Sequence, residues 1–215
     1  SPGKLFVIVL ALITLIGPLA LHLFFPATPA VKAAFGVSDA IAGLPMSVPL
    51  FTMAVFTLVY GSLSDRYGRR PVLLAGILIF VVGSIIAVLS TTIWVLLAGR
   101  LLQAMGGACG MTLARAIARD VFGTDQLVKV MAYLLMAYAM GPMIAPPIGG
   151  FLVDLYGWRS VVLFAGAVGM LLGLLAWAVN QETIEYRRTS TSLESIAADY
   201  RRLFSDARFT AFVLQ

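Results

Sequence analysis

Two polar side chains stand inside a long apolar stretch of the sequence, where they could handle charge in a hydrophobic environment. Arg100 and Gln103 lie one helical turn apart within the stretch 93–118. An arginine at the centre of a membrane helix costs about 2.5–3.5 kcal/mol on insertion scales, so it faces protein or water and needs acceptors such as the Gln103 side chain. We expect Arg100 to tune a neighbouring proton site or to anchor an electronegative group of a bound compound. The alternative is a structural hydrogen-bond hub.

A third side chain, His22, is the one best suited to carry a proton. It lies near the end of the apolar stretch 5–25 and is the single histidine of the chain. The unperturbed pKa of histidine is near neutral, so the imidazole can gain and lose a proton under ordinary conditions. We expect His22 to take part in proton coupling together with Arg100 and Gln103. The alternative is a histidine at a helix end that faces the outer interface.

The composition indicates that a lipid bilayer surrounds these residues. Of the 215 residues, 60% are hydrophobic and 12% are charged, with a mean hydropathy of +0.97, whereas a soluble domain has about 25% charged residues. A helix needs about 20 apolar residues to cross a bilayer. Six stretches are long enough, and the sequence therefore predicts an all-α bundle of six membrane-spanning helices over residues 1–179. The predicted spans are 5–25, 40–62, 71–89, 93–118, 127–155 and 158–179.

The same composition argues against several classes of function. One cysteine and one histidine leave no disulfide framework and no clustered metal site, and the phosphate-loop pattern is absent. No Asp or Glu lies deep in a predicted span, so a catalytic set cannot be assembled there. The net charge of +5 reports membrane orientation before it reports nucleic-acid binding. We expect no enzyme, no metal, no cofactor and no nucleic-acid partner.

Basic residues crowd into alternate loops. The other side of the predicted membrane holds only Lys32 and Arg159. By the positive-inside rule, both ends of the bundle are predicted to be cytoplasmic. The crowded side holds Lys4, then Arg66, Arg69 and Arg70, then Arg115, Arg119 and Lys129, and finally Arg187, Arg188, Arg201, Arg202 and Arg208.

Two segments follow the predicted bundle. Residues 180–208 are polar, with an apolar stripe at Leu193, Ile196, Tyr200 and Leu203, which favours a cytoplasmic linker with an amphipathic helix on the membrane surface. A solvated linker helix is the alternative. Residues 209–215 turn apolar again, and we expect them to begin a seventh span.

One short stretch of the sequence occurs in two similar copies. The stretches "GSLSDRYGRRP" (61–71) and "GFLVDLYGWRS" (150–160) are identical at six of eleven positions and lie 89 residues apart. The same offset places the first three predicted spans on the last three, and an odd number of spans turns the second copy upside down. Inverted three-helix repeats occur in several secondary-transporter folds, so the pattern predicts two such repeats.

Three motifs resemble the signatures of a known family. Residues 61–73 resemble the G-x-L-a-D-r-x-G-r-[rk]-x-x-l loop of the major facilitator superfamily. "LLAGRLLQAMGGA" (96–108) is similar to the signature of its proton-coupled members, although Ala104 replaces the usual glycine. "GPMIAPPIGG" (141–150) is similar to its antiporter signature. Together they resemble the N-terminal half of a twelve-span drug:proton antiporter of the bicyclomycin- or chloramphenicol-resistance type.

The resemblance implies a function and a setting. It implies proton-coupled efflux of small amphipathic drugs across the bacterial inner membrane by alternating access, with a C-terminal six-helix half as the partner. Relatives often carry an aspartate four residues before the proline that matches Pro26, where this chain has His22. Two alternatives stay open: a sugar or amino-acid exporter of the same superfamily, and a half-size, non-transporting subunit that pairs with itself.

The resemblance also implies three groups of site residues. The first is a conformational latch of the outward-open state, the second is a kinked antiporter hinge, and the third is a substrate cavity. The alternatives are a loop that only sets topology, ordinary helix packing, and side chains that face lipid or the core. The latch comprises Gly61, Asp65, Gly68, Arg69, Arg70 and Asp120; the hinge comprises Gly141, Pro142, Pro146, Pro147, Gly149 and Gly150; the cavity residues are Met46, Phe51, Met53, Met105, Met111, Tyr133, Met136 and Tyr138.

Overall fold

The computed structural model describes residues 4–179 and Glu182. Five of its helices each form a complete span, and the shorter helices together form the first span. Six segments are long and apolar enough to cross a membrane, as the sequence predicts. The predicted linker (180–208, apart from Glu182) and the predicted start of a seventh span (209–215) lie outside the described residues. The elements are α1 (Lys4–Thr14), α2 (Ile16–Leu23), η1 (Phe25–Ala27), α3 (Thr28–Phe35), α4 (Asp39–Tyr67), α5 (Arg69–Val88), α6 (Ile93–Val121), α7 (Thr124–Tyr156) and α8 (Trp158–Val179).

The first span is longer than predicted and is made of four short helical pieces. Proline explains both its interruption and its extension. Pro18 has no N–H for the carbonyl of Thr14, where α1 ends. Pro26 and Pro29 instead stand in the first turns of η1 and α3, where a missing N–H costs no hydrogen bond. The predicted loop around these two prolines is therefore helical, and the span continues to Phe35.

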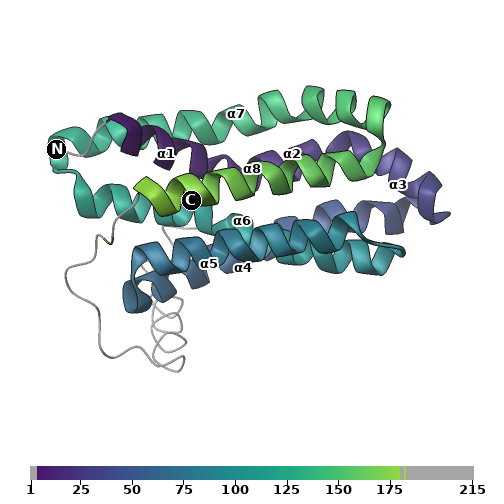
Figure 1. Ribbon diagram of the computed structural model, residues 1–215, viewed down its shortest axis with the longest axis horizontal. Coiled ribbons are helices and arrows are strands. Elements are labelled where there is room, and N and C mark those ends of the chain that lie inside the picture. Colours follow the sequence, from purple (N-terminus) through teal and green to yellow (C-terminus); the bar gives the residue numbers. More distant parts are fainter. Residues whose placement is uncertain (1–3, 180–181, 183–215) are drawn as a thin grey trace, which may run out of the picture.

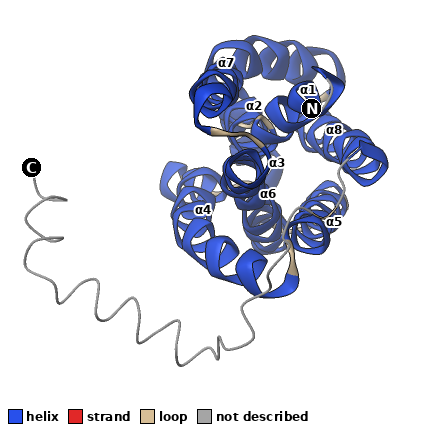
Figure 2. Cartoon of the chain, turned by 90° about the vertical axis from the view of Figure 1, so that its left-hand side faces the viewer, coloured by secondary structure: helices blue, strands red, loops and turns tan. Residues whose placement is uncertain are grey.

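The six spans form two inverted three-helix repeats, and the first span of each repeat packs against the last two spans of the other. The first repeat contains α1–α5 and the second contains α6–α8. The helix α6 packs against α4 and α5, whereas α1 and α2 pack against α7 and α8. The end-on view in Figure 2 shows α6 near α4 and α5, with α7 on the other side of the bundle and α8 beside α5. Because each first helix is buried in the other repeat, neither repeat forms a core by itself.

The doubled turn has the same backbone form in both copies. Gly68 has φ 103° and ψ 152°, and Gly157 has φ 78° and ψ 172°, a left-handed region that glycine enters without a steric cost. The N–H of Gly68 donates to Ser64 O, and that of Gly157 donates to Val153 O. The two copies lie at opposite ends of the bundle (Figure 1). The end with Gly68 also carries the α6–α7 connection and is called the arginine-rich end below.

The third helices of the repeats, α5 and α8, hold each other through the same contact twice. Arg70 Nη2 donates to Trp177 O at 2.8 Å, and Arg159 Nε donates to Val88 O at 3.1 Å. Adding 89 to Arg70 gives Arg159, and adding 89 to Val88 gives Trp177. In each contact an arginine at the start of one helix donates to a carbonyl in the last turn of the other. The sequence repeat is thus also a repeat of tertiary contacts.

The bundle is buried unevenly. Most of α6 lies inside the structure, whereas α4 and α7 expose most of their apolar surface. Among the exposed large side chains of these two helices are Leu50, Phe51, Leu135, Met136 and Met143. An exposed apolar face in a membrane protein meets either lipid or another protein segment, and both uncovered helices carry prolines within them.

Candidate functional site

Arg100 is buried within the bundle and links its own helix, α6, to α4 and α2. The residue is only 3% exposed. Nε donates to Pro45 O of α4 at 3.1 Å, and Nη1 donates to Ala20 O of α2 at 3.2 Å and to Gln103 Oε1 of α6. The guanidinium also lies over the Phe24 ring, 4.4 Å from its centroid. Such a charge is costly in a bilayer, so this many partners fit its interior position.

Proline leaves free the carbonyl that Arg100 uses on α4. The residue four positions after Pro45 is Pro49, which has no N–H to bind the Pro45 carbonyl. On α2 the N–H of Phe24 binds His22 O, so the Ala20 carbonyl also accepts from Arg100. The local breaks in two helices therefore create the acceptors that hold the arginine.

Gln103 extends this network from α6 to α5. Its Nε2 donates to Ser84 Oγ at 2.8 Å, and Ser84 Oγ donates to Phe80 O at 2.9 Å. Gln103 and Ser84 are both buried. The pairing of Arg100 with Gln103 was visible in the sequence as a one-turn spacing. Ser84 was missed, because a single serine in an apolar helix gives no signal.

His22 lines a chamber at the end of the bundle opposite the arginine-rich end. The chamber has a volume of about 690 Å³ and lies between α2, η1, α3, α4 and α7. No hydrogen bond or ion pair to the His22 imidazole occurs within residues 4–179 and Glu182. Three of the predicted cavity residues, Met46, Met53 and Tyr138, line the same space, as do the polar Thr28 and Ser47. Thr28 was missed because the helical course past Pro26 was not foreseen, and Ser47 because a single serine in an apolar helix gives no signal.

The other predicted cavity residues lie outside this chamber wall. Phe51, Tyr133 and Met136 are exposed, Phe51 to 71%. Met105 lines a separate apolar pocket with Phe56, Tyr60 and other residues of α4 and α5. Met111 is half-buried in α6 and is not among the chamber residues. Spacing alone did not show which side of each helix faces the chamber.

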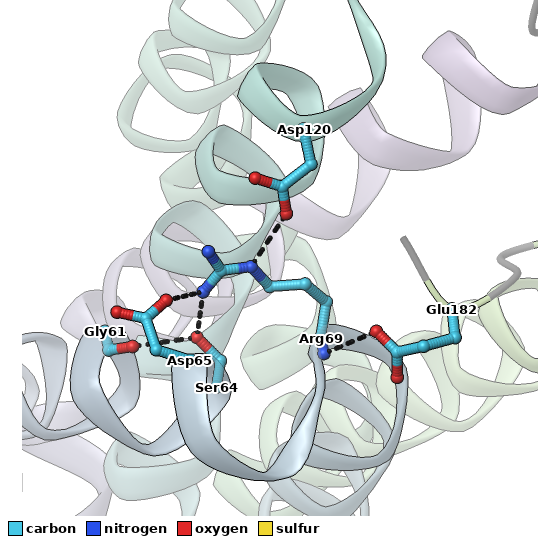
Figure 3. Close-up of polar contacts among 6 residues, drawn as sticks. All are labelled: Gly61, Ser64, Asp65, Arg69, Asp120 and Glu182. Carbon is cyan, nitrogen blue, oxygen red and sulfur yellow. Dashed lines mark hydrogen bonds and ion pairs between the residues drawn. The ribbon is translucent and has the colours of Figure 1, made fainter. Parts of the chain in front are cut away.

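Arg69 ties together the ends of three helices at the arginine-rich end (Figure 3). Its Nη1 lies 2.6 Å from Asp65 Oδ1 of α4, and its Nε lies 2.9 Å from Asp120 Oδ2 of α6. Nη1 also donates to Ser64 Oγ at 2.5 Å. Arg69 is 12% exposed at its side chain, whereas Asp120 is 25% and Asp65 45% exposed. The partly sheltered arginine therefore holds two carboxylates from different spans.

A third carboxylate reaches the same turn from beyond α8. Glu182 Oε1 accepts from the backbone N–H of Arg69 at 2.9 Å (Figure 3). A Cβ at Gly68 would collide with the Glu182 carboxylate, so this glycine provides room as well as a positive φ. Sequence reasoning missed Glu182, because a single acid in a polar stretch gives no signal.

Two further predicted latch residues have different partners. The Gly61 carbonyl accepts from Ser64 Oγ at 2.9 Å (Figure 3), and a Cβ at Gly61 would meet nothing within 4 Å in the described part. Arg70 binds the Trp177 carbonyl of α8, as described above, rather than one of the latch carboxylates.

The predicted hinge residues divide into packed and exposed positions on α7. A Cβ at Gly141 would lie 2.9 Å from Pro18 Cβ of α2. A Cβ at Gly149 would collide with the Leu23 carbonyl and lie 3.0 Å from Pro26 Cγ. The exposed or open positions of the hinge are Pro142, Pro147 and Gly150, and Pro146 is half-buried. Both packed glycines thus contact the first span of the same chain.

Comparisons with known proteins agree in family and fold. The family described as Major Facilitator Superfamily matches residues 10–215. Multidrug resistance protein D of Escherichia coli K12 is 30% identical over 96% of this chain and 52% of that protein. The bicyclomycin resistance protein homolog of Haemophilus influenzae is 26% identical over 83% of this chain and 45% of that protein. The chain spans about half the length of the curated relatives it matches.

Solved structures of transporters share the fold. The human organic anion transporter MFSD10 (TETRAN) is similar with a TM-score of 0.75 and 21% identity, over 92% of this chain and 53% of that one. A D-xylose-proton symporter is similar with a TM-score of 0.71 and 14% identity, over 99% of this chain and 55% of that one. At these identities the likeness concerns the fold alone.

Proposed function

The chain belongs to the Major Facilitator Superfamily, and we propose that it forms the N-terminal half of a proton-coupled exporter of small amphipathic compounds in a bacterial inner membrane. The observation that carries the proposal is the chamber, whose mostly apolar wall contains the single histidine of the chain, His22. Methionine and aromatic side chains such as Met46, Met53 and Tyr138 adapt to compounds of different shape. A sugar exporter would need a more polar wall than this one.

A second six-helix half is the proposed partner. The exposed apolar faces of α4 and α7 support it, because these helices flank the chamber and are the least buried spans. In the proposed protein the second half covers these faces and rocks against them, while the glycines of α7 keep that helix tightly packed on the first span.

The latch and the chamber together suggest one conformational state. In the proposed orientation the arginine-rich end is cytoplasmic. There Arg69 holds Asp65 and Asp120, while the chamber lies toward the opposite end. We infer that the latch stabilises an outward-facing state and that its release accompanies opening to the cytoplasm.

Proton coupling is proposed to lie with His22 and Arg100. His22 takes up a proton from the chamber, and the fixed charge of Arg100 disfavours a second cation nearby. A proton on His22 then alters how well the chamber holds a compound. Gln103 acts as a positioning residue, because it holds Nη1 of Arg100 and is itself held by Ser84.

Transport in inverted membrane vesicles tests this proposal. The full-length protein is expected to accumulate chloramphenicol, or another amphipathic drug, when the vesicle interior is made acidic. Arg100→Ala is expected to abolish accumulation, and His22→Ala is expected to remove its dependence on the proton gradient. If both variants transport like the parent, the coupling assignment is wrong.

A further inference from the structure

A second, much smaller cavity lies beside Arg100, behind the chamber wall. Its volume is about 10 Å³, which is about the room that one water molecule needs. Arg100 and Gln103 supply its polar lining, and Gly17 and Ala104 are among its apolar lining. The cavity is thus a small space beside Arg100, the one buried charged side chain of the described residues.

Arg100, which lines this cavity, has an unused donor. Nε and Nη1 have their acceptors on Pro45, Ala20 and Gln103, whereas Nη2 is buried and has no hydrogen-bond partner among the described residues. A buried N–H of a charged group is costly when it lacks an acceptor. The donor that faces no protein acceptor therefore calls for an oxygen from elsewhere.

Two side chains separate this cavity from the chamber. Leu21 and Met53 are the residues that line both spaces. The end of the Met53 side chain rests on α2, where a Cβ at Gly17 would lie 2.7 Å from Met53 Cε. Methionine is unbranched and has three rotatable bonds, so it can turn aside without moving the backbone. The absence of a side chain at Gly17 leaves the space that the end of the Met53 side chain fills.

We propose that the small cavity is a binding site for one hydrogen-bond-accepting oxygen of a chamber ligand, which reaches Arg100 Nη2 when Met53 turns aside. The site takes a carbonyl, hydroxyl or carboxylate oxygen and leaves the apolar body of the ligand in the chamber. It rests on the proposed function only in naming the chamber as the place where compounds bind. It adds to that function a preference for ligands with an acceptor at one end.

Access to the cavity is tested by thiol labelling of the full-length protein in membranes. Ala104→Cys places a thiol in the cavity wall, and Cys109→Ser removes the native buried thiol of this chain. Methyl methanethiosulfonate is expected to label Cys at position 104 slowly in this background. Met53→Ala is expected to raise the labelling rate severalfold, and Leu21→Ala acts as a second variant of the same wall. Leu50→Ala is the matched control, because Leu50 lines the chamber but not the cavity.

The acceptor requirement is tested with two ligands of nearly the same shape. Acetophenone carries a carbonyl oxygen at one end, and α-methylstyrene has a methylene group in its place. In the Met53→Ala background, acetophenone is expected to protect the thiol at position 104 severalfold better than α-methylstyrene. Equal labelling rates in Met53→Ala, Leu21→Ala and the parent would overturn the gate. Equal protection by the two compounds would overturn the ligand site and assign the cavity to water alone.

These measurements do not depend on transport. A protein that labels as expected but moves no drug would contradict the export proposal and keep the oxygen site. A protein that exports drug but whose labelling rate does not depend on Met53 would keep the export proposal and contradict the oxygen site.

Discussion

At the scale of single residues, the structure explains how an arginine is tolerated inside an apolar bundle. Arg100 takes its acceptors from carbonyls that helix breaks leave free at Pro45 and Ala20. Gln103 fixes one of its nitrogens and passes the contact to Ser84. The charge is thus held by backbone and amide dipoles, and its hydrogen-bond partners in the described part of the chain include no carboxylate.

Removal of Gln103 tests this network. Gln103→Leu loses the bonds to Arg100 and to Ser84. Hydrogen bonds inside membrane proteins average about 0.6 kcal/mol, with a maximum of about 1.7, so we expect the free energy of unfolding to fall by about 1–2 kcal/mol. Denaturant titration of the purified protein measures it. Thr57→Ala is the control, because it removes only an exposed bond to the Met53 carbonyl. Equal stability of the two variants would contradict the network.

At the scale of elements, the glycines of α7 show that neighbouring positions have different roles. Gly149 packs against the Leu23 carbonyl, whereas the next residue, Gly150, faces open space in the described part. The sequence motif presents both glycines alike. Only the packing of α7 on the first span shows which one permits a close approach.

The pair gives a matched prediction. Gly149→Ala forces α7 away from Leu23, and overpacking of this kind costs about 1–3 kcal/mol. Gly150→Ala adds a methyl group without a clash and reduces the backbone entropy of the unfolded chain, so it is expected to be neutral or to stabilise by up to about 1 kcal/mol. Thermal unfolding of the two variants measures the difference. A Gly150→Ala protein as unstable as Gly149→Ala would refute this packing account.

Sequence reasoning reached the elements better than their contacts. The six spans follow from apolar length, and the Arg69–Asp120 pair follows from two opposite charges at adjacent helix ends. The carbonyl partners of Arg70 and Arg159 could not be predicted, because a free carbonyl depends on how helices cross. The helical course past Pro26 was missed because proline was taken as a helix end, whereas here it stands in a first turn.

At the scale of the whole molecule, the inverted repeat distributes different roles to equivalent positions. The two turns share the positive φ of Gly68 and Gly157. Among the described residues, only the first turn has an arginine that pairs with carboxylates, since Trp158 stands where Arg69 would fall in the second. The packing contacts of the repeat are therefore kept at both ends, while the proposed latch exists at one.

The latch predicts a shift between conformations. Asp120→Asn removes one of two partly exposed ion pairs of Arg69, and such pairs contribute about 0.2–1 kcal/mol. We expect the population open at the arginine-rich end to rise by a factor of up to about five, since 1.4 kcal/mol is about tenfold. Spin-label distances across that end of the full-length protein report the population. Lys32→Ala is the control, because it breaks the exposed Lys32–Asp39 pair at the other end. No difference between these variants would argue against a latch.

Drug-evoked proton movement in proteoliposomes is the most direct test of the central claim, which is that His22 and Arg100 couple drug export to protons. The full-length protein is reconstituted in a weakly buffered medium. When it exports chloramphenicol, we expect protons to move in the opposite direction, so the compartment that the drug leaves becomes more acidic. The His22→Asn variant is expected to export the drug without a pH change. Export by the parent that causes no pH change, or an unaltered pH change in both His22→Asn and Arg100→Ala, would contradict the account.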